Sequence, residues 1–272
     1  MCEGQGVFPR IEEKFAFLGA GIIAGVWMER LLDAGVVEPD QIMACDVRPQ
    51  RLEELSKHLG VRTSPENRRG AEFAHLVVLA PPPSEVVAVL REIRPLLGPG
   101  HLVISLAAGV PLAKLEQEVG ASTVVRVFPN TPALVGEAMN LVALSRRTSP
   151  VDRWLLRAPL DALGIWFEVP DEQMDAWFAL CAVGPTYIFP VIEALASAAT
   201  SHGLDAEMAL TAAAQVVSGA AHLVLESGRS PAELKQMISL RTLPEEDART
   251  LFAGAYEAAV SKLQGLAHRL AA

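Results

Sequence analysis

Short apolar runs alternate with amphipathic segments along the first half of this 272-residue chain. Segments such as 22–32 place apolar residues at helical spacing, and the short runs between such segments are continuously apolar. Continuously apolar strands that alternate with helices are typical of a parallel sheet covered by helices on both faces. The predicted strands are 15–18, 42–45, 76–80, 102–106 and 124–127.

The pattern changes after about Glu168, where convincing strands end and helical segments follow one another. The predicted helices are 171–181, 185–201, 205–226, 230–237 and 246–270. We therefore expect two domains, an α/β domain over 1–167 and an all-helical domain over 168–272.

The charge and apolar content of the chain exclude some partners. The net charge is −9, and an acidic chain of this kind is not expected to bind nucleic acid. The stretch 175–202 is long and apolar enough to span a membrane. Gly184-Pro185 and Pro190 interrupt it, so we interpret it as a helix buried on all sides and expect no membrane partner.

The three cysteines, Cys2, Cys45 and Cys181, lie far apart and form no CxxC pattern. Free thiols in a reducing cytosol are the expectation, and no metal site is predicted. Met1 to Lys14 has no apolar core and carries acidic residues, so we expect no signal peptide and a cytoplasmic location.

A glycine-rich turn follows the first predicted strand and opens the first predicted helix. Its GxGxxA pattern is a variant of the dinucleotide-binding fingerprint. The first glycine makes the tight turn, the second lets the backbone approach a pyrophosphate, and the alanine permits close helix packing. The pyrophosphate then lies at the positive end of the helix. The predicted coenzyme-binding residues here are Gly19, Ala20, Gly21, Ile22, Ile23 and Ala24.

The end of the second strand leaves the choice between NADH and NADPH open. Asp46 stands where an acid can hold the ribose hydroxyls and repel a 2′-phosphate, which favours NADH. Arg48 and Arg51 follow at once and can instead clamp a 2′-phosphate, which favours NADPH. Asp46 and Arg48 are both predicted to contact the coenzyme.

Two further segments, 104–110 and 126–137, carry a family resemblance together with the glycine turn. The second reads R-V-F-P-N-T-P-A-L-V-G-E. The chain closely resembles the pyrroline-5-carboxylate reductase family, and the resemblance continues through 184–189, 193–195 and 219–231.

The resemblance implies an N-terminal Rossmann domain and a C-terminal helical dimerisation domain that interleaves with a second copy. A homodimer or higher homo-oligomer is therefore expected, with the apolar helices of 171–225 covered by the partner. The implied reaction is hydride transfer from NADPH or NADH to the C=N carbon of a small cyclic imino acid, converting pyrroline-5-carboxylate to proline.

The resemblance also assigns coenzyme contacts to three strand ends. Asn130, Thr131 and Pro132 are expected near the nicotinamide, although the same residues can simply form a rigid turn. The remaining residues of this set are Ala80, Pro81, Pro82, Ala107, Ala108 and Gly109.

For the substrate, the resemblance suggests pocket walls at Gly184, Pro185 and Tyr187, although core packing is an alternative. Thr186, Ser239 and Thr242 are the candidate catalytic hydroxyl residues. At the family's glycine-rich substrate loop this chain reads I-S-L-R-T-L-P-E over 238–245, without either glycine. Arg241 is a candidate carboxylate partner, or else an exposed residue beside acidic neighbours.

Two other departures are a missing lysine after Ala80 and a missing serine before Gly184. Together with the altered loop they leave two alternatives open. One is a related imine or ketimine reductase with a different substrate, and the other is a non-catalytic NAD(P)-binding regulatory protein.

Overall fold

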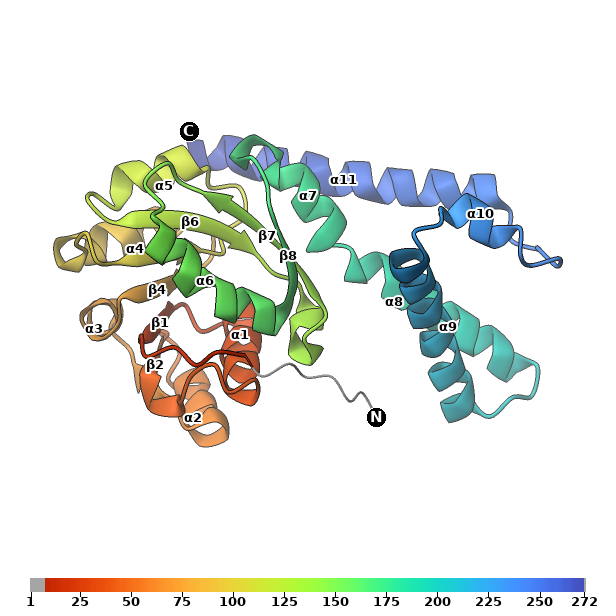
Figure 1. Cartoon of the computed structure of the whole chain (residues 1–272), viewed down its shortest axis with the longest axis horizontal. Coiled ribbons are helices and arrows are strands. Elements are labelled where there is room, and N and C mark those ends of the chain that lie inside the picture. The colour runs from red at the N-terminus through yellow and green to blue at the C-terminus, as the bar shows by residue number, and fades with distance from the viewer. Residues whose placement is uncertain (1–7, 272) are drawn as a thin grey trace. The chain divides into compact units, whose positions relative to one another are not determined.

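The structure, a computed structural model, describes residues 8–271, so Cys2 and the extreme N-terminus lie outside the described residues. An eight-stranded sheet with the order β3-β2-β1-β4-β5-β6-β7-β8 forms its first part (Figure 1). The predicted strands are confirmed as β1 (Phe15–Leu18), β2 (Ile42–Cys45), β4 (Leu76–Leu79), β5 (Leu102–Ser105) and β6 (Thr123–Phe128). They run parallel, and the strand order reverses beside β1, where doubly wound sheets bind ligands.

Three strands were not predicted: β3 (Arg62–Ser64), β7 (Ala138–Leu144) and β8 (Gly164–Glu168). β7 runs antiparallel to β6, so the expectation of a wholly parallel sheet is wrong at this edge. β3 is short and polar and has no continuous apolar run. β8 does contain an apolar run, Ile165 to Phe167, but most of the strand is exposed.

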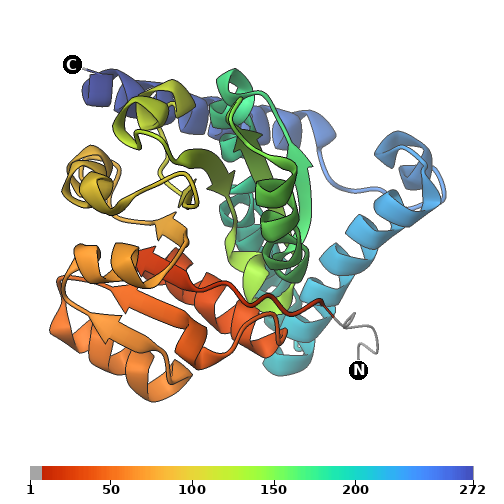
Figure 2. The ribbon, with the colours of Figure 1, turned by 60° about the vertical axis from the view of Figure 1, so that its left-hand side comes forward.

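Helices cover both faces of the sheet (Figure 2). Alternate residues of β1 point to opposite faces, with Phe15 and Phe17 in one core and Ala16 and Leu18 in the other. The first core contains residues of α1 (Ile22–Asp33), α2 (Pro49–Leu59) and α6 (Pro150–Leu163). The second contains residues of α3 (Asn67–Phe73), α4 (Val86–Ile93) and α5 (Leu112–Glu118).

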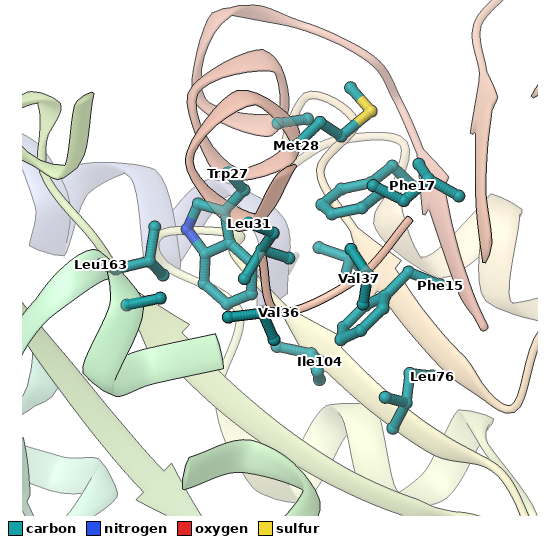
Figure 3. Close-up of a cluster of buried hydrophobic side chains, with 14 of the residues drawn as sticks. Phe15, Phe17, Trp27, Met28, Leu31, Val36, Val37, Leu76, Ile104 and Leu163 are labelled. Atoms are coloured by element: carbon teal, nitrogen blue, oxygen red, sulfur yellow. The ribbon is translucent and has the colours of Figure 1, made fainter. Parts of the chain in front are cut away.

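The first core holds α1 against one face of the sheet. Trp27 of α1 packs edge-on against Phe17, with ring centroids 6.4 Å apart (Figure 3). Leu31 and Leu163 pack in the same cluster, and Trp27, Phe17 and Leu31 are fully buried. Burial of this much apolar surface fixes the position at which α1 begins.

The chain divides into two compact units, residues 1–183 with 259–272 and residues 184–258. The sequence places the domain boundary at 167/168, whereas the contacts place it after Val183. The reason is α7 (Met174–Cys181), whose Met174 and Cys181 are buried with Phe128 of β6. Residues 8–271 also contain four short 3₁₀ helices, at Pro39–Gln41, Arg94–Leu96, Thr131–Val135 and Asp171–Gln173.

The second unit contains α8 (Pro185–Ser201), α9 (Ala206–Ser227), α10 (Pro231–Lys235) and the start of α11 (Glu245–Ala271). α8 and α9 pack against each other (Figure 1). Asp205 caps α9 by accepting a hydrogen bond from the backbone N–H of Met208, at 2.9 Å. All predicted helices of the second half are present, with ends that differ by at most a few residues.

Two segments, Asp171–Ser201 and Ala206–Ser227, are apolar and long enough to cross a membrane by length and composition. Only 11% of each apolar window is buried within the chain. The prediction that 175–202 is buried on all sides is therefore wrong for a single chain. In α8 only Ala196 is buried, while Phe189 and Leu195 are exposed.

Candidate functional site: a dinucleotide cradle at the ends of the strands

Gly19 forms the tight turn that ends β1. Its φ is +88°, and a Cβ would lie 2.6 Å from the carbonyl carbon of Ala80 and from the nitrogen of Pro81. The Gly19 N–H donates to the carbonyl of Cys45 at 2.9 Å. The turn is thus wedged between the ends of β2 and β4, and only glycine fits.

Gly21 is the N-cap residue of α1, and it faces open space. A Cβ at this position would meet no atom within 4 Å. The first N–H groups of a helix have no intrahelical partner and carry partial positive charge, which favours an anion there. Ala24, at the third position of the motif, is fully buried. The residues present therefore fit the pyrophosphate of a dinucleotide.

A pocket of about 500 Å³ opens beside this turn. Predicted coenzyme-binding residues from three strand ends line it together, namely Gly19, Gly21, Asp46, Arg48, Ala80, Pro81 and Pro82. Sequence reasoning missed other lining residues, including Asn67 and Glu85. Glu85 could have been predicted, because it follows closely on the proline run after β4. Asn67 could not, because it begins a short helix that no sequence motif marks.

The other predicted coenzyme contacts do not line this pocket. Ala20 takes part through its backbone, and Ile22 is 82% exposed and lines a second pocket, between α1 and α2. The residues outside the first pocket are Ala20, Ile22, Ile23, Ala24, Ala107, Ala108, Gly109, Asn130, Thr131 and Pro132.

Asp46 is 8% exposed and is held by four hydrogen bonds. Its Oδ2 accepts from the Ala20 N–H at 3.0 Å and from Nη2 of Arg48 at 2.9 Å. Its Oδ1 accepts from the backbone N–H and from Nε of Arg48, both at 2.9 Å. The side-chain hydrogen bond from Arg48 is the largest cause that lowers the pKa of Asp46, to about 2.

Arg51 supports the turn itself. Its Nε donates to the carbonyl of Ala20 at 2.8 Å, and its Nη2 donates to the carbonyl of Gly21 at 3.4 Å. Its Nη1 pairs with Glu54 at 3.2 Å. Arg51 is therefore occupied in holding the glycine turn, and of the two arginines only Arg48 lines the pocket.

Asn130 is built into a turn after β6. Its Nδ2 donates to the carbonyl of Cys181 at 3.0 Å, and its Oδ1 accepts from the N–H of Met139 at 3.2 Å. These bonds match the rigid-turn interpretation of 130–132, with Thr131 exposed at the start of the following 3₁₀ helix. Gly109, in the connection between β5 and α5, has a φ of +72°.

The predicted substrate residues belong to the second unit. Gly184 and Pro185 start α8, and burial raises the pKa of Tyr187, with the charge of Tyr256 as a smaller cause. Ser239, Arg241 and Thr242 lie in the exposed connection between α10 and α11. The pKa of Glu245 is lowered chiefly by its hydrogen bond from Lys235, at 2.5 Å, and less by the charge of Arg241.

Both parts of the chain match known families. Residues 171–266 match the family described as pyrroline-5-carboxylate reductase dimerisation. Residues 14–109 match the family described as NADP oxidoreductase, coenzyme F420-dependent. The two exposed apolar helices, α8 and α9, thus lie within the dimerisation match. The glycine turn and Asp46 lie within the oxidoreductase match.

Curated relatives and solved structures match most of the chain. The pyrroline-5-carboxylate reductase of Methanosarcina acetivorans is 40% identical over 84% of this chain and 84% of its own length. The structure of a pyrroline-5-carboxylate reductase from Coxiella burnetii has a TM-score of 0.80 and 32% identity, covering 94% of this chain and 99% of that one. The Plasmodium falciparum pyrroline carboxylate reductase with NADP bound shares the fold, with a TM-score of 0.86, 24% identity, and coverage of 95% and 100%. The chain therefore belongs to the pyrroline-5-carboxylate reductase family of NAD(P)H-dependent oxidoreductases.

Proposed function

We propose that this chain reduces pyrroline-5-carboxylate to proline. The observation that carries the proposal is the cradle at Gly19 and Gly21, with its pocket, in a chain that belongs to this family. When bound, the coenzyme supplies the hydride that adds to the C=N carbon of the substrate. The protein's own contribution is to bind and orient the two reactants.

Little proton chemistry is required of the side chains. A protonated imine is already electrophilic, so holding its carbon against the hydride donor supplies most of the acceleration. In this proposal Gly184, Pro185 and Tyr187 form walls of the substrate pocket. Thr186, Ser239 and Thr242 are the candidate hydroxyl donors to the substrate, and Arg241 binds its carboxylate through a bidentate pair.

The assembly we propose is a homodimer or higher homo-oligomer in which helical domains interleave and complete the substrate site. The dimerisation match over 171–266 and the exposed apolar faces of α8 and α9 support it. A cytosolic location is part of the same proposal. It is supported by the buried free thiols of Cys45 and Cys181 and by family membership.

A related imine or ketimine reductase remains the second candidate, because of the segment 238–245. This connection has no glycine, and Leu240 is 79% exposed. Backbone donors cannot approach a ligand here as closely as they can at glycine. If the second candidate is correct, we expect the substrate to differ from pyrroline-5-carboxylate in the position of its carboxylate or in the size of its ring.

Oxidation of NADPH and NADH by the purified oligomer, measured with several cyclic imines, distinguishes these functions. Turnover of pyrroline-5-carboxylate with kcat/KM well above that of the other imines supports the proposal. Turnover of other imines alone supports the second candidate. Coenzyme binding without turnover of any imine would contradict both and would point to a non-catalytic NAD(P)-binding protein.

Arg241 is tested by Arg241→Ala. Loss of a bidentate carboxylate contact is expected to raise KM for pyrroline-5-carboxylate about tenfold or more, with a smaller change in kcat. Arg249→Ala is the matched control, because Arg249 is an exposed arginine of α11 paired with Glu246 at 3.4 Å. Unchanged kinetics of Arg241→Ala would exclude Arg241 as the carboxylate partner.

A further inference from the structure

We propose that Arg48 selects NADPH over NADH by binding the 2′-phosphate of the coenzyme, and that Asp46 positions Arg48 for this contact. This role deepens the proposed function, and it rests on that function only in assuming that the coenzyme is NADPH or NADH. It reverses the usual role of an acid at the end of the second strand, which is to hold the ribose hydroxyls of NADH.

The acceptor capacity of Asp46 is already used within the protein. A carboxylate offers about four lone-pair positions, two on each oxygen. Ala20 and Arg48 supply four donors to these oxygens, at 2.9–3.0 Å. A ribose hydroxyl can donate to Asp46 only if it replaces one of these bonds, and those from the Arg48 guanidinium are charge-assisted and stronger than a bond from a neutral hydroxyl.

The charge of Asp46 is compensated in the same contact. Arg48 approaches it with Nε and Nη2, a bidentate pair that fixes the plane of the guanidinium. The repulsion that an acid here normally exerts on a 2′-phosphate is therefore largely cancelled. Asp46 itself is almost completely covered, so Arg48 is anchored to a carboxylate that is fixed in place.

Arg48 has the donors and the exposure that a phosphate contact needs. Its side chain is 59% exposed, and it lines the pocket beside Gly19 and Gly21. Within the described residues 8–271, no hydrogen bond is made by its Nη1. The remaining N–H groups of the planar fork can donate to phosphate oxygens while Nε stays on Asp46.

Arg48 is also the one cation among the described residues that line this pocket. Arg51 is held by the carbonyls of Ala20 and Gly21, and Glu85, which also lines the pocket, adds a negative charge. Discrimination between the coenzymes therefore depends on a single guanidinium, so one substitution tests it.

The test measures binding of 2′,5′-ADP and of ADP to the full-length protein by calorimetry, without any substrate. These fragments differ in the 2′-phosphate at the ribose that Arg48 is proposed to recognise. The native protein is expected to bind 2′,5′-ADP about tenfold more tightly or better, the range of a charge-assisted contact. In Arg48→Gln the preference is expected to fall to about twofold or less, with the larger loss of affinity for 2′,5′-ADP.

Arg157→Gln is the matched control, because Arg157 is an exposed arginine of α6 paired with Asp161 at 3.5 Å. It should keep the native preference. Arg48→Lys, which retains the charge without the fork, is expected to give an intermediate preference and serves if Arg48→Gln does not fold. Titrations with NADP⁺ and NAD⁺ should rank the native protein and its variants in the same order of preference for the 2′-phosphate.

Equal or tighter binding of ADP by the native protein overturns the inference. So does an unchanged preference in Arg48→Gln, or the absence of binding of both fragments at millimolar concentration. Because no imine is present, these results are independent of the substrate. Strong 2′,5′-ADP preference without turnover of pyrroline-5-carboxylate would refute the proposed function and leave the role of Arg48 intact.

Discussion

Gly19 and Gly21 stand two residues apart in one turn, yet the missing side chain serves a different purpose at each. At Gly19 a Cβ would collide with the backbone of Ala80 and Pro81, and the φ is positive. At Gly21 a Cβ would meet no protein atom within 4 Å. The first glycine is therefore needed to fold the turn, and the second is needed to leave room for a ligand.

Gly19→Ala and Gly21→Ala are expected to separate these purposes. Gly19→Ala should lower the free energy of unfolding by about 2 kcal/mol or more, since backbone atoms cannot move aside cheaply. Gly21→Ala should change stability by less than about 1 kcal/mol and weaken coenzyme binding about tenfold or more. Urea unfolding and coenzyme titration measure both quantities. Equal loss of stability in the two variants would contradict this account.

The ion pair between Asp46 and Arg48 makes the free energy of unfolding depend on pH. The pKa of Asp46 is lowered from 3.8 to about 2 in the folded protein, chiefly by the hydrogen bond from Arg48. A lowered folded pKa stabilises the protein above the unfolded pKa, and this contribution is lost as the pH falls through the folded pKa.

We therefore expect Asp46→Asn to be less stable than the native protein at pH 6, by about 2 kcal/mol. The difference should shrink between pH 4 and pH 2, where the native carboxylate becomes protonated. Urea unfolding of both proteins over this range measures it. A difference that does not change with pH would show that the charge of Asp46 is not its source.

Among the elements, β6 is joined to the 3₁₀ helix at Asp171–Gln173 by a partly buried ion pair. Arg126 of β6 is almost fully buried and donates through Nη1 to Oδ1 of Asp171. The other oxygen of Asp171 accepts from the N–H of Leu112 at 2.9 Å, at the start of α5. Asp171 thus ties a central strand, a sheet-covering helix and the segment that leads into α7.

Asp171→Ala is expected to cost about 3 kcal/mol of unfolding free energy, because it leaves the guanidinium of Arg126 buried, with Asp175 at 3.8 Å as its remaining carboxylate among the described residues. Glu172→Ala, at the exposed neighbouring position, should cost less than about 0.5 kcal/mol. Adding Arg126→Met to Asp171→Ala should recover part of the loss. Denaturant unfolding measures the two single variants and the double variant. If the losses of unfolding free energy in Asp171→Ala and Arg126→Met simply add in the double variant, the two residues do not interact.

The elements that the sequence predicted correctly are those whose pattern is local. β1, β2 and the helices of the second half were found from apolar runs and helical periodicity, within a few residues. β7 was missed although Leu141 and Val142 are buried in it, because its pairing partner, β6, precedes it across a turn built by Asn130. That turn depends on side-chain bonds to Met139 and Cys181, which spacing in the sequence does not reveal.

Across the whole molecule, the apolar surface that one chain leaves uncovered lies largely in its second unit. Leu210, Val216 and Leu223 of α9 are exposed, and so are Phe189 and Leu195 of α8. Residues 171–266 match the family's dimerisation domain, and exposed apolar surface of this kind is typical of an interface between subunits.

Val216→Asp is expected to weaken assembly, because it places a charge on an apolar face of α9. Light scattering at micromolar concentration should show dissociation, and reductase activity should become dependent on protein concentration. Val151→Asp is the matched control, since Val151 on α6 is equally exposed, at 64%, and an acid is tolerated at a helix start. A native-sized oligomer for Val216→Asp would contradict the proposed interface.

The sequence by itself determined the Rossmann fold of the first half, the helical second half and the glycine turn. These features depend on the periodicity of neighbouring residues, which the chain carries locally. Only the tertiary structure decided that Asp46 is occupied by Ala20 and Arg48, and that Arg51 supports the turn instead of lining the pocket. The reason is that a side chain's free donors and acceptors are set by partners brought together through packing.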